Sequence, residues 1–196
     1  LGSILVGLGK LKDAEVSTRK AIQLNPNFAE SHYNLGIILR ELGKSQDAEL
    51  SARKAIQLNP NFADAHSNLG NILKDLGKLQ EAELSARKAI EIKPDFADAA
   101  WNLSGLANTI EEAEERINQC LKIDENYLEA KLTLSALKLH QGDQSLFDNL
   151  IKSTHKDHPT TRSIKWVSTL PKLPELYFHR WALFDSMINK SKKDRP

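Results

Sequence analysis

The sequence has little of several residues on which common kinds of site depend. Its 196 residues include a single cysteine, Cys120. No disulfide can therefore form within the chain, and no set of thiolates can hold zinc or an iron–sulfur cluster. A reducing cytoplasm is the expected location. No apolar run approaches the roughly 20 residues that cross a bilayer, so no membrane partner is expected.

An excess of charge of one sign is also missing. The chain has 27 Lys and Arg against 26 Asp and Glu, a net charge of +1. Binding to nucleic acid needs unbalanced positive charge, so we expect no nucleic-acid partner. Phosphate loops and catalytic constellations are absent from the sequence, and the neighbours of His32 and His66 lack metal ligands. The sequence therefore predicts no enzyme activity, no cofactor and no metal.

What the sequence does contain is a repeat with a period of 34 residues, set by Pro26, Pro60 and Pro94. Each copy is typical of two helices, because apolar residues such as Leu35, Ile38 and Leu39 recur at helical spacing. Glycine adopts the left-handed conformation that ends helices, so the first helices should stop at Gly43 and Gly77. Small residues where the two helices of a copy cross should let their backbones approach closely; they are Gly36, Ala48, Ala52 and Ala55.

The pattern resembles the tetratricopeptide repeat. Residues 29–62 and 63–96 match its spaced positions, including Leu35-Gly36 and Leu69-Gly70, although His32 and His66 stand where the family has a large aromatic residue. The resemblance implies an all-α fold, a right-handed α-solenoid of helix-turn-helix repeats. Such solenoids bind extended peptides or proteins along the concave face formed by the first helices. The resemblance thus implies a protein-binding or peptide-binding scaffold.

Counting outward from these two copies gives the remaining domain organisation. Residues 1–28 read as a partial repeat, residues 97–127 as a repeat shortened by three residues, and residues 128–158 as a divergent repeat. The deletion is close to one helical turn, so the first helix of the shortened copy should lose a turn. Residues 159–196 are predicted to hold a capping helix and a linker. We interpret the chain as a fragment whose uncovered N-terminal repeat favours end-to-end self-association.

Asparagines occupy one repeat position of the first helices in three successive copies. Asn34, Asn68 and Asn102 each precede a Leu-Gly or Leu-Ser step. A side-chain amide can pair with the backbone of an extended peptide. The row is similar to the superhelical domain of O-linked N-acetylglucosamine transferases, whose asparagines hold peptide substrates. Asn71, Tyr33 and Trp101 complete the predicted site. The alternatives are idle asparagines, and aromatic rings that only pack between repeats.

Charged residues set further limits on the partner. Glu30, Asp64, Asp98 and Glu129 lie early in the first helices and would repel a C-terminal carboxylate. In the second helices Arg-Lys pairs recur, and a glutamate precedes each arginine by four residues. That order favours ion pairs within each helix, so we expect a neutral outer face rather than a basic stripe.

The segment 173–185 departs from the repeat. It is similar to the segment that joins tetratricopeptide repeats to a macrocin O-methyltransferase-like domain in marine bacterial and cyanobacterial proteins. The resemblance implies a bacterial chain that is the substrate-recognition arm of a larger transferase, with a catalytic domain beyond this chain. The alternative is a capping helix with no enzyme behind it.

Overall fold

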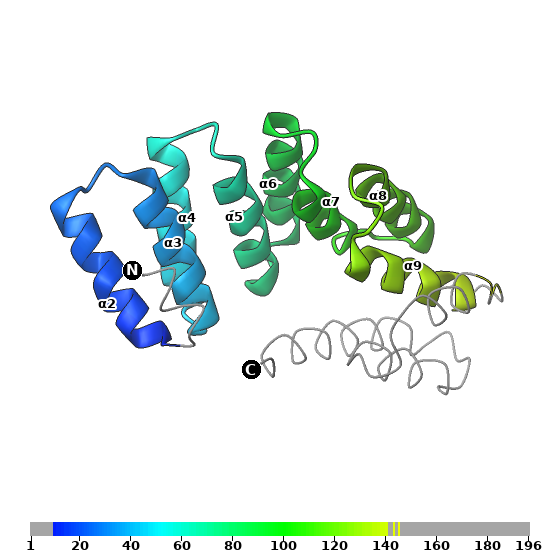
Figure 1. Ribbon diagram of the computed structural model, residues 1–196, viewed down its shortest axis with the longest axis horizontal. Coiled ribbons are helices and arrows are strands. Elements are labelled where there is room, and N and C mark those ends of the chain that lie inside the picture. The colour runs from blue at the N-terminus through cyan, green and yellow to red at the C-terminus, as the bar shows by residue number, and fades with distance from the viewer. Residues whose placement is uncertain (1–9, 141–142, 144, 146–196) are drawn as a thin grey trace. The chain divides into compact units, whose positions relative to one another are not determined.

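The computed structural model describes residues 10–140, 143 and 145, which form helices and no strand (Figure 1). The helices are α2 (Leu11–Leu24), α3 (Ala29–Glu41), α4 (Ser45–Leu58), α5 (Ala63–Asp75), α6 (Leu79–Ile92), α7 (Ala97–Ser104), α8 (Ile110–Ile123) and α9 (Leu128–His140). The prediction of an all-α fold is confirmed. The predicted capping helix and the apolar residues of the N-terminal end lie outside the described residues. None of the described helices is long and apolar enough to span a membrane.

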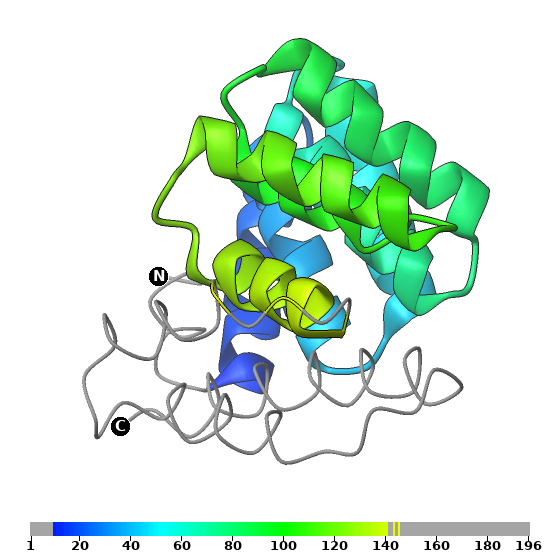
Figure 2. The ribbon, with the colours of Figure 1, turned by 90° about the vertical axis from the view of Figure 1, so that its right-hand side faces the viewer.

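The chain divides into two units, Leu1–Glu125 and Asn126–Pro196, and the second contributes only α9 to the helices described. In the first unit α3 packs on α4, α5 on α6, and α7 on α8. Figure 2, viewed along the long axis of Figure 1, shows these helix pairs one behind another. The predicted helix-turn-helix repeats are therefore present as packed pairs.

The first and second helices of the pairs form two different faces. The first helices α3, α5 and α7 pack directly on one another in succession, whereas successive second helices touch at most marginally. The first helices lie toward the viewer in Figure 1. We call the surface of α3, α5 and α7 the inner face. The surface of the second helices α2, α4, α6 and α8 is the outer face.

The ends of α3 and α5 are set by glycine. Gly43 and Gly77 both have a φ of 75°, the left-handed conformation that other residues adopt at a cost. Beyond Gly43, the backbone N–H of Lys44 donates to the carbonyl of Leu39 at 2.8 Å. The backbone N–H of Gly43 donates to the carbonyl of Arg40 at 2.9 Å. This pair of bonds is the Schellman motif, which satisfies carbonyls at a helix end. The predicted stop signals are confirmed.

Small residues mark the crossing of the two helices in each pair. A Cβ atom on Gly70 would lie 3.2 Å from the carbonyl oxygen of Ala82 and 3.5 Å from the backbone nitrogen of Ala86. Gly36 meets Ala48 and Ala52 in the same way, at 3.4 and 3.5 Å. The alanines on the second helices are fully buried. The backbones are therefore in near contact, as the sequence predicts, and larger side chains have no room there.

The first helix of the shortened repeat loses more than the expected single turn. Helix α7 has 8 residues, whereas α3 and α5 have 13 each. The deletion of three residues explains only part of the difference. The connection to α8 also starts earlier, because α8 has its own N-cap: the hydroxyl of Thr109 accepts from the backbone N–H of Glu112 at 3.1 Å. The carboxylate of Glu112 accepts in turn from the N–H of Asn108 at 2.9 Å.

Candidate functional site

The three predicted asparagines lie on successive first helices, but their amides are in different environments. Asn102 on α7 donates from Nδ2 to the hydroxyl of Ser67 on α5 at 3.1 Å. Asn68 on α5 is 9% exposed, and its Nδ2 atom is buried with no hydrogen-bond partner among the described residues. Asn34 on α3 is half-buried, and its side-chain amide makes no hydrogen bond to the described part of the chain. The row is present, but its members are not equivalent.

The difference between Asn68 and Asn102 follows from the residue one repeat back. Ser67 supplies the acceptor for Asn102, and the matching position for Asn68 holds Tyr33. A tyrosine has no hydroxyl close to its backbone, so no equivalent bond forms. The Nδ2 atom of Asn68 lies instead against Gly36, 3.3 Å from where a Cβ atom would stand. Asn68 thus packs between α3 and α5.

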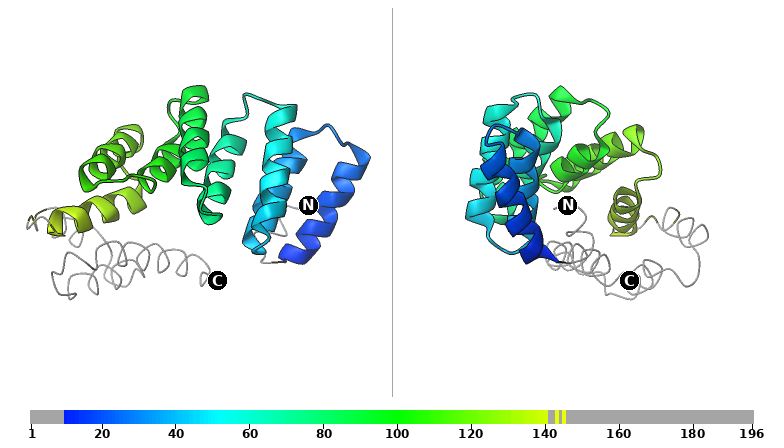
Figure 3. Two further views of the ribbon diagram at one scale, coloured as in Figure 1. Left: turned by 180° about the vertical axis from the view of Figure 1, so that it is seen from behind. Right: turned by 60° about the vertical axis from the view of Figure 1, so that its left-hand side comes forward.

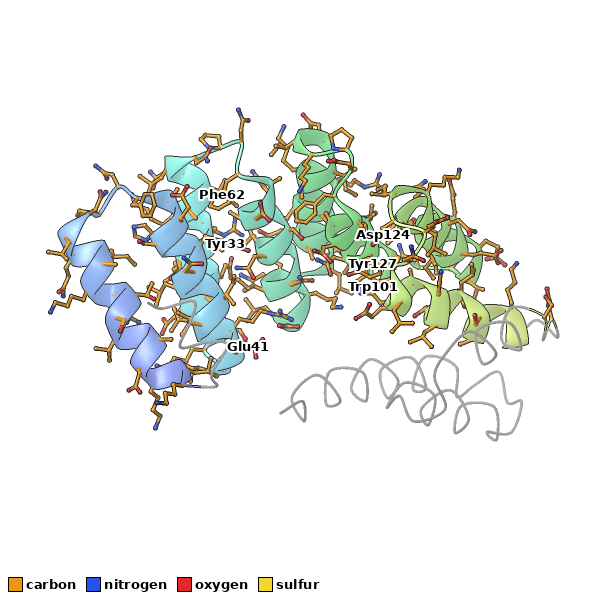
Figure 4. All side chains as sticks on the ribbon, in the orientation of Figure 1. Tyr33, Glu41, Phe62, Trp101, Asp124 and Tyr127 are labelled. Atoms are coloured by element: carbon orange, nitrogen blue, oxygen red, sulfur yellow. The ribbon has the colours of Figure 1, made fainter. Side chains whose placement is uncertain are left out.

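Tyr33 packs against an aromatic residue of the turn before α5. Its ring centroid lies 5.0 Å from that of Phe62, with the planes inclined at 48° (Figure 4). Burial of the phenol raises the pKa of Tyr33, and the carboxylates of Asp64 and Asp98 raise it further. The hydroxyl therefore keeps its proton at neutral pH and remains a donor. Asp64 and Asp98, two of the carboxylates predicted at the inner edge, therefore lie near this tyrosine.

The other predicted site residues also belong to the first helices of the inner face. Asn71 on α5 is half-buried, with an amide that makes no hydrogen bond to the described residues. Trp101 on α7 is half-buried, and its backbone carbonyl accepts from the hydroxyl of Ser104 at 2.7 Å. The predicted amides and rings are thus spread along α3, α5 and α7, one repeat apart.

The repeated histidines have a structural partner. His32 Nε2 lies 2.8 Å from the carbonyl oxygen of Pro26, and His66 Nε2 lies 2.9 Å from that of Pro60. Each imidazole thereby joins a first helix to the turn that precedes it. The described residues contain no group of three or more histidine, cysteine or acidic side chains able to hold a metal ion. The single cysteine, Cys120, is fully buried.

The predicted ion pairs of the outer face are confirmed. Each repeated glutamate pairs with the arginine four residues later, at distances of 2.8 or 2.9 Å; the pairs are Glu15–Arg19, Glu49–Arg53 and Glu83–Arg87. Two of these glutamates also bind a lysine of the following repeat. Lys44 lies 2.8 Å from Glu15, and Lys78 lies 2.8 Å from Glu49. The glutamates therefore connect neighbouring repeats, which the spacing within one helix did not predict.

At the next interface a buried arginine takes the place of the lysine. The Arg116 side chain on α8 is 7% exposed, and its Nη2 lies 2.5 Å from Glu83. It also donates from Nη1 to the carbonyl of Leu103 at 3.0 Å and pairs with Glu112. Sequence reasoning missed this residue. The available signal was Arg116 itself, an arginine at a helix position that holds serine in the three earlier copies.

These ion pairs predict loss of stability in acid. Hydrogen bonds from Lys44 and Lys78 are the main cause that holds the pKa of Glu15 and of Glu49 below 4.5. A carboxyl with a lowered pKa in the folded state stabilises the protein above its unfolded pKa, and this contribution is lost as the pH falls through the folded value. In urea titrations we expect a constant midpoint from about pH 6 to 8 and a falling midpoint below about pH 4.5. The urea midpoint of the double variant E15Q/E49Q should fall less steeply below this pH. The same slope as in the wild type would contradict the assignment of the acid sensitivity to Glu15 and Glu49.

Comparison with known families identifies the repeats. Models of the tetratricopeptide repeat match residues 1–28, 18–49 and 63–96, and a further model described as TPR repeat matches residues 38–77. The chain carries tetratricopeptide repeats. A comparison with curated proteins finds no match.

Solved structures of tetratricopeptide proteins share the fold. A thermophilic one from Thermus thermophilus is 18% identical with a TM-score of 0.72, over 86% of this chain and 96% of that one. YrrB, described as having an unusual peptide-binding site, is 17% identical with a TM-score of 0.60, over 84% and 88% of the two chains. An O-GlcNAc transferase of Thermobaculum terrenum is 23% identical with a TM-score of 0.59, over 62% of this chain and 24% of the transferase.

Proposed function

We propose that the tetratricopeptide repeats bind an extended peptide or protein segment along the inner face. Asn34 and Asn71 carry this proposal. Both are half-buried, lie on the neighbouring helices α3 and α5, and have amides that make no hydrogen bond within the described part of the chain. Each amide offers two donors and an acceptor, the groups that pair with a peptide backbone whatever its side chains.

The spacing of the repeats suits an extended ligand. Packed helices lie about 8 to 10 Å apart, and an extended chain advances about 3.3 Å per residue. One repeat therefore corresponds to about three ligand residues, so successive first helices meet the ligand backbone at intervals of about three residues. Tyr33 and Trp101 would contact ligand side chains, since aromatic residues are favoured at such positions. Asn68 and Asn102 would fix the separation of the helices and offer their remaining acceptor atoms.

The proposal is tested by removing the two free amides together. Peptides selected from a random 12-residue library on the full chain would be titrated by fluorescence anisotropy against the double variant N34A/N71A. Loss of two hydrogen bonds of about 1 kcal/mol each predicts affinity at least tenfold weaker, with the helical circular dichroism unchanged.

The matched control is N118A, because Asn118 is an exposed asparagine on the second helix α8. Its affinity should equal that of the wild type. Selected peptides that bind N34A/N71A as tightly as the wild type would contradict the inner-face proposal. The triple variant N34A/N68A/N102A should also lose binding, but two of its substitutions alter contacts between helices.

A second candidate is a substrate-recognition arm of a larger transferase. It is supported by the similarity of the repeats to part of an O-GlcNAc transferase. Reading the gene beyond Pro196 tests it, since a catalytic domain for glycosyl or methyl transfer must follow. A stop codon directly after Pro196 would exclude a catalytic domain on that side of the repeats.

A further inference from the structure

The outer face contains an open groove between the second helices α4 and α6. Its volume is about 440 Å³, and residues of three helices line it, among them Ile56 of α4, Leu84 of α6, and His66 and Leu69 of α5. Helices α4 and α6 barely touch on either side of it, and the His66 imidazole lies 2.9 Å from the carbonyl oxygen of Pro60. The left view of Figure 3 shows these second helices from behind.

The lining of this groove is repeated in the sequence. Each of its lining residues is matched by the same residue type 34 positions earlier, between α2 and α4. His32, Leu35 and Leu50, for example, correspond to His66, Leu69 and Leu84. In the following repeat the pattern ends, because Ala100 replaces the histidine and Glu115 replaces the leucine. The outer face therefore has two chemically equivalent positions one repeat apart.

Exposed aliphatic residues follow the same period. Val16, Leu50 and Leu84 each occupy the sixth position of their helix and are 69%, 69% and 68% exposed. We call these three residues the aliphatic stripe. Large apolar side chains that are so exposed at a regular spacing favour a partner with the same spacing. The stripe of a second copy of this chain has that spacing.

Charges border the stripe on both sides along the helix axes. The first turns of α2, α4 and α6 carry Asp13, Asp47 and Glu81, three positions before each stripe residue. Lysines lie four positions after it, next to arginines that already pair with glutamates of their own helices; the lysines are Lys20, Lys54 and Lys88. Rotating a second copy by 180° about the line of the stripe makes the helices antiparallel. The acidic border of each copy then faces the basic border of the other.

We propose that the outer face of α2, α4 and α6 is a self-association surface, on which a second copy of this chain packs through the aliphatic stripe with its second helices antiparallel. The groove of one copy then faces the same groove of the second copy, and Leu84 of each copy covers the groove of the other. The contact is isologous and closes at a dimer. Three aliphatic side chains supply less area than a standard interface, so the dimer is weak and forms at high concentration.

Sedimentation velocity on the full 196-residue chain, up to several hundred micromolar, tests the surface. The wild type should show a monomer–dimer equilibrium, and the variant L50E/L84E should weaken it at least tenfold with unchanged circular dichroism. The matched control is L24E, because Leu24 is 80% exposed on α2 but lies outside the stripe; it should dimerise like the wild type. A wild type that remains monomeric, or a dimer that L50E/L84E leaves intact, overturns the proposal.

Charge reversal tests the antiparallel arrangement separately. The variant D13K/D47K should dimerise poorly with itself, because two basic borders then meet, and K20E/K54E should do so because two acidic borders meet. Mixed together, the two variants should form a heterodimer at least as tight as the wild-type dimer. A mixture that does not associate overturns the arrangement. None of these substitutions touches Asn34 or Asn71, so the outcome is independent of peptide binding on the inner face.

Discussion

Replacing Arg116 with alanine is expected to lower the free energy of unfolding by about 2 to 3 kcal/mol. The Arg116 side chain is 7% exposed, and its guanidinium binds Glu83, Glu112 and the carbonyl of Leu103. Without it, two carboxylates and a carbonyl that are partly removed from water each lose one donor, although Arg87, Asn108 and Leu106 still donate to them. The carboxylates keep part of their hydration, which places the loss at or below the lower end of the values of about 3 to 5 kcal/mol for fully buried pairs. Urea denaturation followed by circular dichroism measures it.

The chain offers a matched control for this prediction. Arg87 binds the same Glu83 oxygen as Arg116, at 2.8 Å, but its side chain is 59% exposed. Because water replaces an exposed partner at little cost, R87A should change the free energy of unfolding by no more than about 0.5 kcal/mol. Equal losses in R116A and R87A would show that burial of Arg116 contributes nothing to stability.

A second large effect is expected from Gly70→Leu. The added Cβ atom alone would stand 3.2 Å from the carbonyl of Ala82, and the rest of the side chain would be forced between the backbones of α5 and α6. Overpacking against backbone cannot be relieved by rotating a side chain. We expect a loss of about 3 kcal/mol and increased hydrogen exchange in both helices.

Gly105→Leu is the control for the glycine prediction. Gly105 has an ordinary φ of −72°, and a Cβ atom there would make ordinary contacts at 3.6 Å. The substitution should therefore leave stability unchanged or raise it slightly, because it reduces the entropy of the unfolded chain. A similar loss in both variants would mean that the close approach at Gly70 is not the cause.

The features that the sequence predicted correctly depend on short spacing. A glycine after an apolar helix period predicts where α3 and α5 end, and a four-residue spacing predicts the Glu49–Arg53 pair, because both follow from geometry within one helix. Small residues on the two helices of one copy likewise predicted the close crossing at Gly36. Such features need no knowledge of how the repeats stack.

The features that sequence reasoning missed depend on neighbouring repeats. Whether Asn68 or Asn102 finds an acceptor is decided by the residue on the preceding first helix, 35 positions earlier. Arg116 reaches Glu83 across 33 positions, and the outer groove exists because α4 and α6 stay apart. These contacts require the angle and offset between repeats, which a sequence period does not specify. The length of α7 was also misjudged, since the N-cap of α8 competes for the connecting residues.

The short α7 gives the inner face a direction. Five fewer residues at 1.5 Å each make α7 about 7 Å shorter than α5. The inner face is therefore narrower along the helix axis at α7 than at α3 and α5. The last-turn pair Arg40–Asp75, which links α3 to α5 at 2.6 Å, has no counterpart between α5 and α7 because α7 ends at Ser104. If an extended ligand binds this face as proposed, it meets longer helices at α3 and α5 than at α7, so its two chain directions are not equivalent.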